Sequence, residues 1–187
     1  MSDVFNVARF FVDAYQYDED YITNLKLQKL LYYAHGHYLA RTGKPLFRNN
    51  VEAWEFGPVI PAVYHAYKVC GNRPIETNDN PISRDLFDDV EYNVLLDVLR
   101  EYGKYSGKGL VDLTHMQGTP WETVYKGNND IIPNDIIEHY FKNNEPLSSL
   151  NDILHQLHLN TDTLRSANGT VLLPADEYED WSEYDNV

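Results

Sequence analysis

The chain has 187 residues and carries 29 acidic against 15 basic side chains, a formal net charge of -14. This length is typical of one domain, and such a domain buries roughly 70% of the surface of its unfolded chain, so that neither a metal nor a disulfide is required for stability. The acidic balance disfavours direct binding to nucleic acid, because a phosphate backbone would be repelled. It is typical either of a protein that binds a partner with a basic face or of one whose charge serves solubility alone.

The chain shows no sign of export or membrane insertion. Its single cysteine, Cys70, cannot form an internal disulfide and fits a reducing compartment. The N-terminal stretch lacks a basic start and a long apolar run, and no segment approaches the ~18 apolar residues of a membrane span. We therefore expect a cytoplasmic protein.

Apolar residues recur at helical spacing along most of the chain. The first helix has Ser2 as its expected N-cap. The clearest local signal is a capping box in which Thr119 and Glu122 would bond each other's backbone N–H. The predicted helices cover residues 3–16, 23–42, 61–70, 84–102, a short segment after Ser106, a turn from Thr119, a segment from Pro133 to about Asn143, and one around Leu150 to Leu157.

One short strand or β-hairpin is expected within residues 46–56, where helical spacing is absent, with Gly57 and Pro58 as a turn. The sequence thus predicts a mainly α, compact multi-helix single domain over residues 1–159. Residues 160–187 hold seven carboxylates and one arginine, so we expect an acidic C-terminal extension there.

Two histidines flank a glycine in the second predicted helix. Residues two apart on a helix lie about 200° apart around its axis, so His35 and His37 are not expected to bind one metal ion. Gly36 costs a helix up to ~1 kcal/mol relative to alanine and suggests that another backbone packs against it. Lys26 and Lys29 share a face with Tyr33 and would give a partly basic stripe.

Sequence signatures of catalysis are missing: there is no Gly-rich phosphate loop, HExxH or GxSxG. His155 and His158 could share a helix face, but no third metal ligand is evident. We expect no enzyme activity, no cofactor and no metal. The remaining alternative is a hydrolase or transferase that uses His65 or His115.

Aromatic residues are the more informative group, at 13% of the chain. Tyrosine and tryptophan are enriched at protein interfaces, so the candidate partner-binding residues include Tyr33, Trp54 and Tyr64, although Trp54 and Tyr64 could equally belong to the core. Further candidates recur every third residue in the acidic extension, where an induced helix would align them: Tyr178, Trp181 and Tyr184.

Three blocks of the sequence resemble a known family. They read LKLQKLLYYAHGHYLARTGKPLF, VEAWEFGPVIPAVYHAYK and LTHMQGTPWETVY. In this order they resemble the SocA-like antitoxin family, also called the Panacea domain, whose members are often described as phage-associated proteins. The resemblance covers about residues 3–145. His35, His37, Glu55 and Met116 depart from the family pattern.

The resemblance implies a helical, non-enzymatic domain that binds and neutralises a cognate toxin by direct protein contact. It does not identify the toxin. The alternative function is a phage-encoded adaptor or inhibitor that engages a host protein, either by presenting it to a protease or by mimicking nucleic acid with carboxylates.

Overall fold

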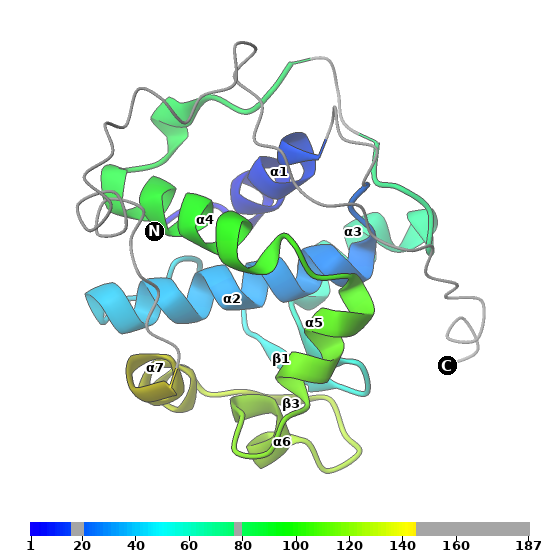
Figure 1. Cartoon of the computed structure of the whole chain (residues 1–187), viewed down its shortest axis with the longest axis vertical. Coiled ribbons are helices and arrows are strands. Elements are labelled where there is room, and N and C mark those ends of the chain that lie inside the picture. Colours follow the sequence, from blue (N-terminus) through cyan, green and yellow to red (C-terminus); the bar gives the residue numbers. More distant parts are fainter. Residues whose placement is uncertain (16–20, 77–79, 145–187) are drawn as a thin grey trace.

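The computed structural model describes residues 1–15, 21–76 and 80–144. Figure 1 shows this part of the chain as an assembly of helices with one small sheet, which confirms the predicted mainly α fold class. The helices are α1 (Val4–Ala14), α2 (Asn24–Thr42), α3 (Pro61–Tyr67), α4 (Asp89–Tyr102), α5 (Gly107–Thr114), α6 (Pro120–Val124) and α7 (Asn134–Asn144), with short 3-10 turns at Lys68–Cys70 and Arg84–Leu86.

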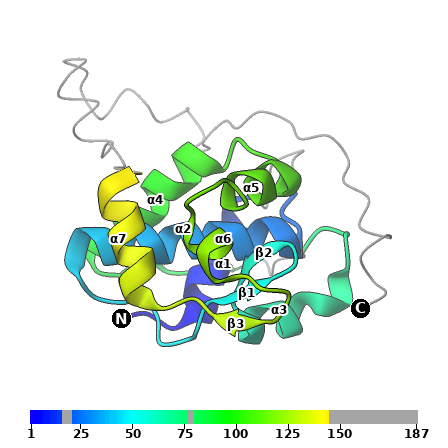
Figure 2. The ribbon, with the colours of Figure 1, turned by 90° about the horizontal axis from the view of Figure 1, so that it is seen from below.

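Helix α2 runs through the centre of the fold. In Figure 1, α1 and α4 lie on one side of it, and α6, α7 and the sheet lie on the other, an arrangement that Figure 2 shows from below. Every residue from 26 to 39 is buried, which is the pattern of a core helix. The predicted inward leucines are therefore buried, but so is the face that the sequence offered as a partly basic stripe.

The close neighbour of Gly36 is a side chain. A Cβ built at Gly36 would lie 2.3 Å from a ring carbon of Phe141 on α7, so only glycine leaves room for this ring. The expectation that another backbone packs at Gly36 was wrong, because the aromatic ring fills the space instead. Helix α7 thereby packs directly on α2.

The N-termini of the helices follow ordinary capping chemistry, with one shift in α1. Ser106 caps α5 as its position before the predicted short helix indicates, and Thr23, the expected first residue of the second helix, is the N-cap of α2. Helix α1 is capped by Asp3, whose carboxylate accepts from the Phe5 N–H, and not by Ser2. The side chain of Thr119 accepts from the Glu122 N–H, but the Glu122 carboxylate accepts from Gly118 N, one residue before the expected partner.

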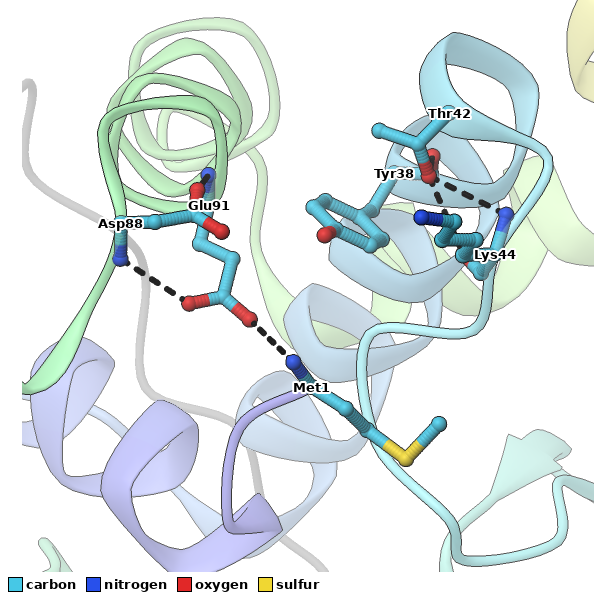
Figure 3. A network of polar contacts seen from close by, with 6 residues as sticks. All are labelled: Met1, Tyr38, Thr42, Lys44, Asp88 and Glu91. Atoms are coloured by element: carbon cyan, nitrogen blue, oxygen red, sulfur yellow. Dashed lines mark hydrogen bonds and ion pairs between the residues drawn. The ribbon is translucent and has the colours of Figure 1, made fainter.

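Helix α4 begins at Asp89, later than the predicted residue 84, because a complete capping box lies at its start. Asp88 Oδ1 accepts from Glu91 N at 2.8 Å, and Glu91 Oε2 accepts from Asp88 N at 3.1 Å, as Figure 3 shows. The other Glu91 oxygen lies 3.1 Å from the amino nitrogen of Met1. Val90, expected on the inward face of this helix, is 41% exposed.

The sheet has the strand order β2-β1-β3, from strands β1 (Glu52–Trp54), β2 (Gly57–Val59) and β3 (Asp130–Ile131). Strands β1 and β2 form the predicted hairpin, but Gly57 and Pro58 belong to its second strand and the turn lies at Glu55 and Phe56. Strand β3 pairs antiparallel with β1. It was not predicted, because a strand of two residues is too short to show an alternation of apolar and polar side chains.

The predicted helix around Leu150 to Leu157 and the acidic extension from residue 160 lie outside the described residues.

Candidate interaction site

Polar side chains of the buried helix α2 position the segment that follows the hairpin. Asn24 Nδ2 donates to the Tyr64 carbonyl at 3.2 Å, and Gln28 Oε1 accepts from Ile60 N at 2.9 Å. The two side chains are also bonded to each other, because Gln28 Nε2 donates to Asn24 Oδ1 at 3.0 Å. These bonds satisfy buried polar groups and fix the start of α3, where Pro61 occupies the first helical turn.

Lys29 holds the hairpin itself. Its Nζ is fully buried and donates to the Pro58 carbonyl at 3.0 Å. Burial lowers the pKa of Lys29 from 10.5 to about 7, because the charged ammonium loses its hydration. Gly57 beside it has φ +99°, and a Cβ there would lie 2.7 Å from Thr114 Oγ1 and 2.8 Å from Lys29 Nζ. Strand β2 therefore packs closely against α2 and the end of α5.

Trp54 is held on several sides at the end of β1. Its indole Nε1 donates to Glu52 Oε2 at 2.9 Å, and its carbonyl accepts from the indole Nε1 of Trp121 at 2.7 Å. The Tyr64 ring meets it edge to face with the ring centroids 4.9 Å apart. The Trp54 side chain remains half-buried, so a fixed indole ring is presented at the surface.

A second set of stacked rings is joined to Trp54 through the hydrogen bond from Trp121. The Trp121 ring is parallel to His115 at 3.7 Å and to Tyr125 at 4.7 Å between centroids. Burial, together with the charge of Lys29, lowers the pKa of His115 below its usual value. The stacking on Trp121 makes His115 part of this aromatic cluster. Stacked rings of this kind form a rigid wall, since each ring restricts its neighbour.

A pocket of about 470 Å³ opens between these groups. Trp54 and Tyr64 line it together, and its walls come from the start of α2, the hairpin, α3 with the turn after it, and the loop after α6. Its volume lies within the range of ordinary ligand pockets. The aromatic lining comes from Trp54, Phe56, Tyr64, His65 and Tyr125, and the charged lining from Glu55 and Lys68.

The structure brings together two of the predicted partner-binding residues, Trp54 and Tyr64. Tyr33 lies elsewhere: its side chain is 2% exposed and stacks on Tyr102 at 3.8 Å, so it contributes to the core and not to a contact surface. The predicted residues Tyr178, Trp181 and Tyr184 lie outside the described residues.

Sequence reasoning did not identify Phe56 and Tyr125 as members of this site. Phe56 sits at the hairpin turn beside Trp54, and the misplaced turn hid its position. Tyr125 lies 71 residues after Trp54, and no local signal connects the two. His65 was considered only as a possible base, and it is exposed at the pocket rim next to Tyr64.

The two histidines of α2 have different neighbours, as their spacing predicted. His35 Nε2 donates to Asn134 Oδ1 at 3.0 Å, and His37 Nε2 is hydrogen-bonded to the Tyr102 hydroxyl at 3.0 Å. Burial lowers the pKa of His35 to about 4 and, with a contribution from the nearby Arg41 charge, that of His37 to about 3. Both rings are therefore neutral at pH 7.

Within residues 1–15, 21–76 and 80–144, no group of three or more His, Cys, Asp and Glu side chains is placed to hold a metal ion. Over the same ranges, no helix combines the length and apolar character of a membrane span.

Comparisons with known proteins agree with the resemblance seen in the sequence. A curated relative, "Antitoxin SocA" from Caulobacter vibrioides (strain NA1000 / CB15N), is 37% identical over 120 residues, which cover 57% of this chain and 61% of the relative. The chain thus spans less than two thirds of that relative's length. No solved structure matches the chain. The family model described as "Antitoxin SocA-like, Panacea domain" matches residues 27–122, just over half of the sequence, and the chain therefore belongs to this family.

Proposed function

We propose that this protein is an antitoxin that binds a cognate toxin protein directly and blocks its active or substrate-binding face, without catalysis of its own. Support comes from membership of an antitoxin family and from the relative named as an antitoxin. The observation that carries the proposal is the pocket around Trp54 and Tyr64, two residues that lie within the matched region.

The aromatic pocket suits protein binding for a physical reason. Tryptophan and tyrosine provide large contact areas and lose little side-chain entropy on binding. Trp54 loses even less, because Glu52 and Tyr64 already hold its indole ring in place. A preorganised site keeps more of its contact energy as affinity.

The test is growth rescue in cells that express the gene adjacent to this one, with and without the protein. Rescue supports the proposal, and a neighbour that is not toxic, or toxicity that persists beside the protein, contradicts it. Trp54→Ala and Tyr64→Ala are expected to lose rescue while the protein remains folded by circular dichroism. Tyr105→Ala is the matched control, since Tyr105 is also half-buried but does not line the pocket.

The acidic extension is proposed as a second contact surface. Residues 160–187 hold seven acidic side chains and one arginine, whereas the described residues, four times as many or more, hold 16 acidic and 14 basic side chains. Negative charge is therefore concentrated in the extension, which would steer association with a basic partner. The triple variant Tyr178→Ser, Trp181→Ser and Tyr184→Ser should bind the toxin more weakly in a pull-down if these rings take part in the interface. Unchanged binding would remove them from the interface.

A second variant of the acidic extension separates the alternative function. A nucleic-acid mimic acts through its carboxylates, so Glu177→Gln, Glu179→Gln and Asp180→Asn together would abolish activity under that alternative. Neutralisation of a toxin by the domain predicts that rescue continues, because the lost charges only slow association with the partner. Growth rescue by the amide variant measures which of the two holds.

A further inference from the structure

The walls of the pocket define the chemistry of the group that fits it. Five aromatic rings line it, and Trp54 presents the ring type that attracts cations most strongly through its π face. Glu55 lines the same pocket, is exposed, and comes directly after Trp54 at the hairpin turn. A second carboxylate, Glu52, is held against the edge of the Trp54 indole at 2.9 Å from Nε1.

We infer that this pocket receives an arginine side chain of the protein partner, with the guanidinium on the aromatic rings and within reach of Glu55. A guanidinium is planar, stacks on aromatic faces and can bond a carboxylate through two N–H groups at once. Its apolar stem can lie along the remaining pocket wall, where Val59 and Leu25 are found. This inference rests on the proposed function for the identity of the partner.

The charge of the pocket is decided locally. The described residues hold 16 acidic and 14 basic side chains, so their net charge is too small to attract a positively charged ligand by itself. Lys68 is the one lysine or arginine among the lining residues, and it opposes a cation. The two lining charges therefore have opposite predicted effects: Glu55 strengthens arginine binding and Lys68 weakens it.

The experiment uses the full chain labelled with ¹⁵N and follows the indole N–H signals, with that of Trp54 assigned by its loss in Trp54→Phe. The probe is the peptide acetyl-Ala-Arg-Ala-amide. The matched probe carries citrulline, which has the shape of arginine without its charge. We expect the arginine peptide to shift the Trp54 signal and to bind more tightly than the citrulline peptide.

The lining charges are then changed one at a time. Glu55→Gln should lower the affinity for the arginine peptide and Lys68→Gln should raise it. Each change should be about two- to five-fold, as for exposed charge pairs. Glu76→Gln, an exposed carboxylate outside the pocket, is the control and should change nothing. Equal binding of the citrulline peptide, an absent Trp54 shift at millimolar peptide, or effects of reversed sign would overturn the inference.

Growth rescue separates this inference from the proposed function. If Trp54→Ala loses rescue while Glu55→Lys leaves it intact, the pocket binds the toxin but not through an arginine. If the peptide binds as expected while Trp54→Ala retains full rescue, the charge preference stands and the pocket is not the toxin site. Loss of rescue in both Trp54→Ala and Glu55→Lys supports both proposals.

Discussion

Replacing Gly36 by alanine tests the packing of α7 on α2, and we expect it to destabilise the protein. In an unobstructed helix this change would stabilise by up to about 1 kcal/mol, because alanine is the better helix former. Here the new Cβ would lie 2.3, 2.4 and 2.7 Å from three carbons of the Phe141 ring. These distances are far inside van der Waals contact, so the ring must move.

Phe141 has little room to move. It is 1% exposed and contacts the rings of His37 at 4.6 Å, Tyr32 at 5.5 Å and Tyr33 at 5.9 Å between centroids. Overpacking of a core costs about 1–3 kcal/mol, and full expulsion of a phenylalanine from its site approaches about 3–5 kcal/mol. After subtraction of the helix-propensity gain, the net loss should be between about 0 and 4 kcal/mol, and the short distances to a buried ring favour the upper part of this range.

The assay is urea unfolding followed by far-UV circular dichroism for four proteins: wild type, Gly36→Ala, Phe141→Leu, and the double variant. Leucine removes the ring atoms that obstruct the new methyl group, so the double variant should lose less stability than the sum of the single variants. A Gly36→Ala protein that is more stable than wild type, or strictly additive effects, would refute the packing argument.

Three further predictions concern buried groups. Gly57→Ala should destabilise by at least about 1 kcal/mol in urea unfolding, because φ is +99° and Thr114 Oγ1 and Lys29 Nζ occupy the space. Lys29 has a folded pKa of about 7 against 10.5 unfolded, so the unfolded chain binds more protons between these values. Stability should therefore gain on the order of 2 kcal/mol from pH 7 to pH 9, and Lys29→Met, measured over the same range, should lack this gain. His35 and His37 have folded pKa values of about 4 and about 3 against 6.5 unfolded, so stability should fall as pH drops below 6.5. The loss should be on the order of 1–2 kcal/mol per histidine at pH 5, and His35→Gln should flatten the stability profile between pH 7 and pH 5, whereas an unchanged slope would show that His35 is not buried in its neutral form.

Much of the local structure could be predicted from the sequence because neighbouring residues determine it. Thr23 and Ser106 cap their helices through bonds to N–H groups three residues away, and these distances are visible in any printed sequence. The same local logic separated His35 from His37. Prediction from neighbouring residues failed at the start of α4, where the capping box at Asp88 lies among several acidic residues. It also failed at β3, which exists only through its pairing with β1.

The site was predicted only in part for the same reason. Trp54 and Tyr64 were chosen for their residue type, and nothing in the sequence showed that they touch. Tyr33, chosen on the same ground, is buried because Tyr102, 69 positions later, stacks on it. Residue type indicates what a side chain can do at an interface, whereas exposure depends on which distant segments cover it.

The sequence by itself determined where α2 begins and ends, the divergence of its two histidines, and the family to which the three blocks belong. Only the tertiary structure decided that α2 is buried on all sides, that Lys29 is held in a dry site by Pro58, and that a pocket opens beside Trp54. The physical reason is that hydrogen bonds within a helix span four residues, while burial and pockets arise from contacts between segments that are far apart in the chain.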